Sequence, residues 1–181
     1  MKLVISIAAV LAIGSLTGCS RLTSKSPADV SATIRASLEN AGLKAVSVNQ
    51  DNEKGVVTLG GHVDVDGEKS KAAEVARSLA PGLVISNEIA VVTPGSEGAS
   101  KTINSDLDKG IESNLHAELV KHKLNDHVSY SVKNHVVTLT GEVRSQTSRA
   151  RAEALATAVP NVQQVVNELQ IKVMKATSSS N

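Results

Sequence analysis

The chain contains two segments in which helix-type and strand-type hydrophobic spacing follow one another in the same order. In the first segment, Ile34 and Leu38 have the spacing of one helix face, and alternating apolar residues over 46–63 predict a β-hairpin. A second helix is predicted over about 67–80 and a third strand over 85–91. The order of elements is therefore helix, strand, strand, helix, strand.

The second segment repeats this order at a distance of 80 residues. Shifting the sequence by 80 positions places Val56–Val63 on Val136–Val143 and Asn87 on Asn167 without a gap. Self-similarity at a fixed spacing is typical of duplicated modules. We therefore expect an α+β protein of two tandem αββαβ modules, each a small three-stranded mixed sheet covered by two helices, with right-handed crossovers.

The predicted boundaries are 27–92 for the first module and 105–173 for the second. Residues 93–104 between them are rich in Gly and Ser and predict a flexible linker, and 174–181 predict a disordered polar tail. Modules of about 65 residues are near the lower size limit for independent stability. Their size therefore favours docking of the two modules on each other.

The N-terminal residues predict processing and lipid attachment. Residues 1–18 have one positive residue, Lys2, and an apolar run too short to span a bilayer, as in a signal peptide. Residues 16–19 (Leu-Thr-Gly-Cys) resemble the lipobox of bacterial lipoproteins. By resemblance to those of Gram-negative bacteria, the serine that follows implies delivery to the outer membrane, facing the periplasm. We expect 1–18 to be removed, Cys19 to carry the lipid and 19–26 to be a tether. The alternative is an ordinary signal peptide with an incidental cysteine.

Composition excludes several classes of function. The chain has no Trp or Phe and one Tyr, and its 19 Lys and Arg nearly balance 18 Asp and Glu. Surfaces that stack on bases or sugars need aromatic residues, and DNA-binding proteins normally carry a basic excess, so we expect no nucleic-acid partner. Because Cys19 is the only cysteine, a disulfide, a Cys-ligated metal and a thiol nucleophile are excluded from the mature chain.

Catalytic motifs are also missing from the sequence. There is no G-x-S-x-G elbow and no phosphate-binding glycine loop. Four histidines gather in the second half of the chain, but none of them pairs with another at the i, i+4 spacing of a helical metal site: His116, His122, His127 and His135. The sequence therefore predicts a non-enzymatic protein without metal or cofactor.

Three features together resemble the BON domain (bacterial OsmY and nodulation). These are the pattern V-T-L-x-G-x-V at Val57–Val63 and Val137–Val143, the helix alanines Ala72 and Ala76, and a closing strand that contains asparagine. A lipobox ahead of two such modules resembles the DolP-like lipoproteins. This resemblance implies a role in envelope integrity, with binding of anionic phospholipid by the second module. The second choice is an OsmY-like chaperone or assembly factor that binds envelope proteins; a small-ligand site ranks third.

One helix departs from the DolP-like pattern. In those relatives the first helix of the second module has aromatic character and contacts the membrane. Here it carries four acidic residues and no aromatic one: Asp106, Asp108, Glu112 and Glu118. The resemblance therefore does not extend to membrane contact by this helix, and Tyr130 is expected to be a core or rim residue of a strand because it alternates with valines.

The two modules differ in charge, which points to the binding residues. Residues 28–92 carry six Lys and Arg against nine Asp and Glu, whereas 106–175 carry nine against eight. The candidate contacts with an anionic membrane lie around two helix ends of the second module: Lys121, Lys123, Arg144, Arg149 and Arg151. Solvated surface charge is the alternative for all five. Residues that recur in both modules are expected to be structural: Gly61, Gly141, Asn87 and Asn167.

Overall fold

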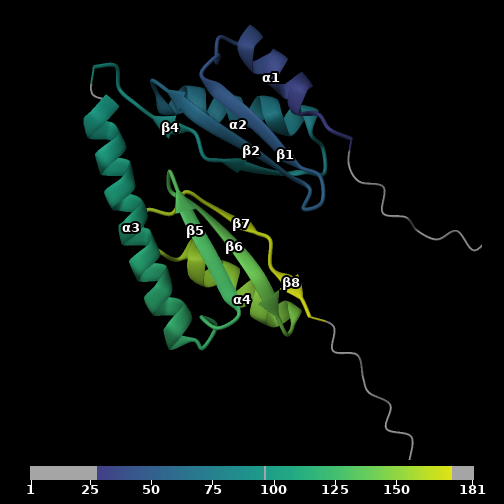
Figure 1. Ribbon diagram of the computed structural model, residues 1–181, viewed down its shortest axis with the longest axis vertical. Coiled ribbons are helices and arrows are strands. Elements are labelled where there is room, and N and C mark those ends of the chain that lie inside the picture. The colour runs from purple at the N-terminus through teal and green to yellow at the C-terminus, as the bar shows by residue number, and fades with distance from the viewer. Residues whose placement is uncertain (1–27, 96, 173–181) are drawn as a thin grey trace, which may run out of the picture.

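The computed structural model describes residues 28–95 and 97–172, which form two α+β modules (Figure 1). The predicted signal peptide 1–18, the lipidation site Cys19, the tether 19–26 and the tail 174–181 lie outside the described residues. Within the described residues, no helix has both the length and the apolar character needed to cross a bilayer.

Module 1 follows the predicted order. Its elements are α1 Ser31–Asn40, β1 Val46–Asp51, β2 Val56–Val63, α2 Asp66–Leu79, β3 Val84–Asn87 and β4 Ala90–Val91. Strand β1 pairs antiparallel with β2, and both β3 and β4 pair parallel with β2. The predicted third strand is therefore present as two short strands, because pairing with β2 is interrupted between Asn87 and Ala90.

Module 2 repeats this topology. Its elements are α3 Glu97–Lys121, β5 Val128–Lys133, β6 Val136–Val143, α4 Gln146–Thr157, β7 Gln164–Asn167 and β8 Gln170–Ile171. Strand β6 is the centre of the sheet, antiparallel to β5 and parallel to β7 and β8. The structure thus confirms two tandem modules with mixed sheets.

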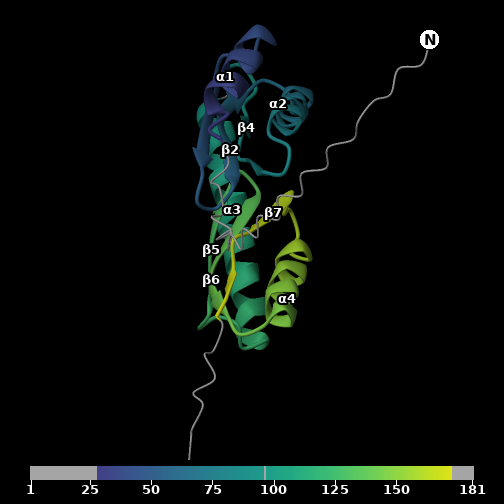
Figure 2. The ribbon, with the colours of Figure 1, turned by 90° about the vertical axis from the view of Figure 1, so that its right-hand side faces the viewer.

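The same pattern of apolar residues makes the core of each module. In module 1 the first helix places Ile34 and Leu38 on the sheet, and both are fully buried. The second helix places Ala72 and Ala76 there, and these small side chains allow it to approach the strands closely. In Figure 2, α2 and α4 lie on the same side of the two sheets.

The segment between the modules differs from the prediction. Residues 93–104 were expected to be a flexible linker, but α3 begins at Glu97 and runs without a break to Lys121. The side chain of Glu97 accepts a hydrogen bond from Gly95 N, and Thr102 Oγ1 donates to Gly98 O at 3.0 Å. Once a helix is nucleated, adding a residue costs little free energy because each one also adds a backbone hydrogen bond. The core-facing helix of module 2 can therefore extend toward module 1.

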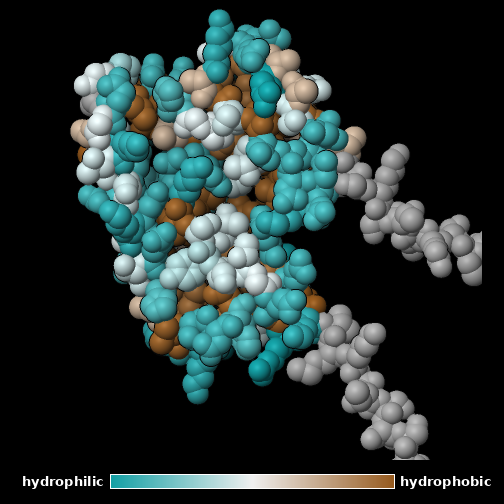
Figure 3. Space-filling view, viewed as in Figure 1, coloured by the Kyte–Doolittle hydropathy of each residue, from teal (hydrophilic) through white to brown (hydrophobic). Residues whose placement is uncertain are grey.

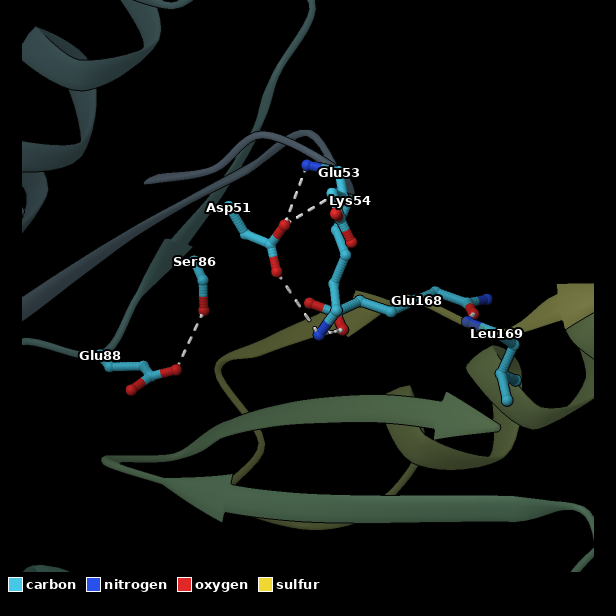
Figure 4. Close-up of polar contacts among 8 residues, drawn as sticks. Asp51, Glu53, Lys54, Ser86, Glu88, Glu168 and Leu169 are labelled. Atoms are coloured by element: carbon cyan, nitrogen blue, oxygen red, sulfur yellow. Dashed lines mark hydrogen bonds and ion pairs between the residues drawn. The ribbon is translucent and has the colours of Figure 1, made fainter. Parts of the chain in front are cut away.

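The two modules dock along β3 and β7. The side-chain amide of Gln164 bridges the two strands, because its oxygen accepts from Asn87 N at 3.0 Å and its nitrogen donates to Ile85 O. Three valines form a small buried cluster beside this bridge: Val56, Val136 and Val166. At one edge Lys54 Nζ lies 2.8 Å from Glu168 Oε2 (Figure 4).

Candidate functional site

A basic pocket lies at the end of module 2, at the side remote from module 1, where α3 ends (Figure 1). Its volume is about 330 Å³. Three of the five predicted membrane contacts line it together with two histidines, and no carboxylate does: Lys123, Arg144, Arg151, His122 and His127. The cations come from three segments of the chain, namely the turn after α3, the connection from β6 to α4, and α4 itself.

The turn after α3 directs Lys123 toward this pocket. Leu124 N donates to Leu119 O at 2.9 Å and Lys123 N donates to Val120 O at 3.0 Å, which is the hydrogen-bond pattern of a Schellman helix end. This motif places Lys123 in the left-handed region, with φ of 56°. In module 1 the same position is Gly42, with φ of 88°.

The N-terminus of α4 adds positive potential to the pocket. Ser145 caps the helix, since its hydroxyl accepts from Ser148 N at 3.1 Å. The first turn of α4 contains no acidic residue, whereas the first turn of α2 contains Asp66 and Glu68. A helix N-terminus carries about half a positive charge, which carboxylates in the first turn offset. Of these two helices, only α4 has an N-terminal partial charge that no first-turn carboxylate offsets.

The basic set belongs to module 2 alone. The matching helix ends, glycine contacts and repeat spacing assign five module 1 residues to the positions of the pocket's five charged or titratable ones: Ala41, Gly42, Ala45, Asp64 and Lys71. A residue that the fold requires should recur in both modules. A cation recurs at the Arg151 position, where module 1 has Lys71, but not at the positions of Lys123 and Arg144, so the fold does not account for those two.

Arg151 and His122 form the tightest polar contact at the pocket. Arg151 Nη2 lies 2.9 Å from His122 Nδ1, and His122 Nε2 lies 3.6 Å from Glu118 Oε2. The matching contact in module 1 joins Lys71 Nζ to the main-chain oxygen of Ala41 at 3.4 Å. Sequence reasoning did not include His122 or His127 in the site, although His122 is next to Lys123 and four of the five histidines gather in the second half of the chain.

The other two predicted contacts lie elsewhere. Lys121 stays on the exposed side of α3, where its Nζ is 3.4 Å from Glu118 Oε1. Arg149 turns toward the sheet and donates to Asn167 O at 3.0 Å. Tyr130 packs against the module 2 core, and its pKa is raised by burial and by the nearby Glu112 carboxylate.

The recurrent residues occupy matching structural positions. Gly61 and Gly141 both have positive φ, and a Cβ on either would collide with the carbonyl oxygen of Ala45 or His127 respectively. Asn87 Nδ2 donates to Lys69 O at 3.0 Å, which ties β3 to α2. Asn167 Nδ2 donates to Glu153 Oε2 at 2.8 Å, which ties β7 to α4.

Comparison with solved structures adds no argument about function. The C-terminal domain of CdsD, a structural protein of the type III secretion system of Chlamydia trachomatis, matches with a TM-score of 0.33 and 15% identity, over 75% of this chain and 61% of that one. A second CdsD structure matches with the same score and 16% identity, over 81% of this chain and 63% of that one. The chain thus spans about three fifths of these structures.

Sequence comparison agrees with the duplication. The osmotically-inducible protein Y of Escherichia coli K12 is 29% identical over 146 residues, which are 79% of this chain and 71% of that protein. The BON domain family matches twice, at residues 26–93 and 107–173. Since these two ranges cover most of both αββαβ modules and most of the chain, the protein is a member of the BON domain family.

Proposed function

We propose that this protein is an outer-membrane lipoprotein, facing the periplasm, whose second module binds the anionic surface of a phospholipid membrane and so supports envelope integrity. The observation that carries the proposal is the meeting of Lys123, Arg144 and Arg151 around one pocket at the uncompensated end of α4. All three side chains are exposed, as contact with a membrane surface requires.

The expected affinity is low but sufficient. Each basic residue near an anionic membrane contributes on the order of 1 kcal/mol, so three contribute about 3 kcal/mol. An acyl chain on Cys19 would keep the modules close to the membrane, where the effective concentration of lipid is about millimolar or higher. Even a weak site is then occupied by lipid. Its role is to orient the modules on the membrane, while the acyl chain holds them there.

The binding is expected to be electrostatic. No aromatic side chain is available at the pocket to insert among lipid tails, because Tyr130 packs on the core of module 2. Interactions between exposed charges are screened over about 8 Å at physiological salt. Binding to vesicles should therefore weaken steeply as the salt concentration rises.

Vesicle co-sedimentation tests the lipid site. The chain from residue 20 onward, which includes every described residue, is mixed with vesicles of phosphatidylglycerol or phosphatidylcholine. Changing Lys123, Arg144 and Arg151 to Ser should abolish the excess binding to phosphatidylglycerol. The matched control changes three exposed lysines elsewhere, Lys44, Lys101 and Lys109, and should retain most of it. Equal binding to both lipids, or equal loss in both variants, would contradict the proposal.

The anchor is tested separately. Cells that express the full chain are labelled with radioactive palmitate, which should enter the protein and should not enter the Cys19→Ser variant. Label that persists in Cys19→Ser, or that is missing from both, would remove the lipoprotein part of the proposal. It would leave the vesicle result untouched.

A second candidate function is binding of envelope proteins as a chaperone or assembly factor. It is favoured by a cavity of about 660 Å³ that lies between α3 and the two sheets and has Ala90, Val92 and Val132 in its wall. Figure 3 shows apolar surface in this hollow. In vivo crosslinking separates the two functions, because protein adducts that survive charge reversal of Lys123, Arg144 and Arg151 would favour the second.

A further inference from the structure

One hydrogen bond at the basic pocket fixes the protonation state of a histidine. Arg151 Nη2 lies 2.9 Å from His122 Nδ1. A guanidinium has only N–H donors and does not lose its proton in proteins, so Nδ1 has to be the acceptor. An imidazole accepts at Nδ1 only when it is neutral, with its proton on Nε2. That proton then faces Glu118 Oε2, which is 3.6 Å from Nε2.

Proton uptake by His122 breaks this arrangement. A proton on Nδ1 opposes the N–H groups of Arg151 and places two positive charges at hydrogen-bond distance, so the contact between them is lost. The imidazolium keeps an oppositely charged partner in Glu118, on its other side. Protonation therefore moves the histidine from its bond with Arg151 to an ion pair with Glu118 and releases the guanidinium.

The groups around His122 leave the released charge unneutralised. Helix α3 contributes Glu118 and Lys121, helix α4 contributes Arg151, and the turns beside them contribute three more titratable or cationic groups: Lys123, His127 and Arg144. Glu118 is the carboxylate that contacts His122, and it lies outside the pocket wall. Two further carboxylates, Asp126 and Glu142, line the adjoining pocket that shares His127 and Arg144, and neither lines the basic pocket itself. A proton taken up by His122 thus raises the positive charge that faces an anionic ligand.

Module 1 lacks this sensitivity to pH. There Lys71 Nζ donates to the main-chain oxygen of Ala41, which takes up no proton in the physiological range. The contact in module 2 has the same place in the fold but uses an imidazole, the side chain whose charge ordinarily changes between about pH 5 and 8. The duplication therefore supplies a pH-insensitive counterpart of the same contact.

We propose that His122 acts as a proton-operated latch on the lipid site. At neutral pH it holds Arg151 against the end of α3. At mildly acidic pH it frees Arg151 and adds its own charge, which strengthens binding of anionic phospholipid. His127 lines the same pocket and is a second imidazole there. This inference rests on the proposed function of the pocket.

Side-chain NMR tests the latch without any lipid. In the chain from residue 20 onward, the guanidinium signals of Arg151 should shift with the same midpoint as the ring signals of His122 between about pH 7.5 and 5.5. His122→Asn supplies an amide oxygen that accepts from Arg151 but takes up no proton, so the shift should vanish. His116→Asn, on the exposed side of α3, should leave it unchanged. Arg151 signals that ignore the protonation of His122 would overturn the latch.

Vesicle binding tests the consequence for the site. Each added charge should raise partition onto vesicles that contain phosphatidylglycerol by about fivefold, so the rise from pH 7.5 to 5.5 should be on the order of 25-fold. It should fall to about fivefold in His122→Asn and disappear in the double variant with His127→Asn. The same pH dependence in wild type and His122→Asn would overturn the latch alone. Failure to bind phosphatidylglycerol above phosphatidylcholine at either pH would instead contradict the lipid site.

Discussion

Glu88 and Glu168 occupy equivalent positions in the two modules, and each carboxylate pairs with a lysine of the other module. Lys133 Nζ lies 3.1 Å from Glu88 Oε2, and Lys54 Nζ lies 2.8 Å from Glu168 Oε2. Both lysines are at the hairpin end of their own sheet. The two glutamates are equivalent but the lysines are not, because the strand register matches Lys133 with Asp51 while Lys54 lies in the turn between β1 and β2. The interface is therefore only approximately symmetric.

Charge reversal at Glu168 should weaken the docking of the modules. The Glu168 side chain is 12% exposed, so Glu168→Lys places a like charge against Lys54 in a poorly solvated position. We expect the free energy of unfolding to fall by about 2 kcal/mol, between the values for exposed and buried pairs. Urea denaturation measures it.

Two further variants make that result specific. The double change Lys54→Glu and Glu168→Lys restores opposite charges and should recover at least half of the loss. Asp106→Lys reverses one member of an ion pair on α3 in which both side chains are mostly exposed, and should cost less than about 0.5 kcal/mol. A double variant no more stable than Glu168→Lys would show that the ion pair does not contribute to docking.

Lys123 holds a backbone conformation that favours glycine, and its replacement should stabilise the protein. Lys123→Gly relieves a left-handed position with φ of 56° and should raise the free energy of unfolding by about 1 kcal/mol, while it weakens binding to phosphatidylglycerol. Gly42→Lys, at the matching position of module 1, should lower stability by a similar amount because φ is 88° there. Thermal unfolding of both variants checks the pair, and a destabilised Lys123→Gly would refute the argument.

The repeat predicted the element order because the buried residues recur at matching positions in the two copies. Ile34 and Leu38 of α1 correspond to Leu115 and Leu119 of α3, and all four are fully buried. The Gly and Ser residues between the modules predicted a flexible linker. That prediction was wrong because the C-terminal half of α3, which packs on the core, supports helix in the residues before it, and local composition does not show this. The structure therefore differs from the sequence expectation mainly at 97–104.

The candidate site was predictable in region but not in detail. Arg149 and Arg151 are two positions apart on α4, which places them on nearly opposite sides of the helix. Arg149 donates a hydrogen bond to Asn167 O, whereas Arg151 contacts His122, which is 29 positions away in the sequence. Lys121 and Lys123 separate because α3 ends between them. Charge patterning finds such a cluster, but only the fold shows which of its members meet.

Alanine at Gly61 or Gly141 should be strongly destabilising. Each position combines a positive φ with a carbonyl oxygen where the Cβ would lie, so strand pairing has to shift to admit a methyl group. We expect a loss of at least about 3 kcal/mol for each variant, measured by urea denaturation. Gly110→Ala is the matched control, because its Cβ meets nothing within 4 Å in the interior of α3, and it should stabilise by about 1 kcal/mol. A loss for Gly110→Ala as large as the other two would refute the steric argument.

Lys69 should make stability depend on pH in the alkaline range. Its ammonium lies between the modules, where Nζ donates to Gln163 Oε1 at 2.9 Å, and burial lowers its pKa below 10.5 against the attraction of Asp66 and Asp108. The unfolded chain therefore binds more protons than the folded one just below pH 10.5, so this lysine contributes a free energy of unfolding that rises with pH. Relative to Lys69→Met, the wild type should gain stability in urea denaturation as the pH rises toward 10.5. A difference that falls or stays constant over that range would show that burial does not dominate at Lys69.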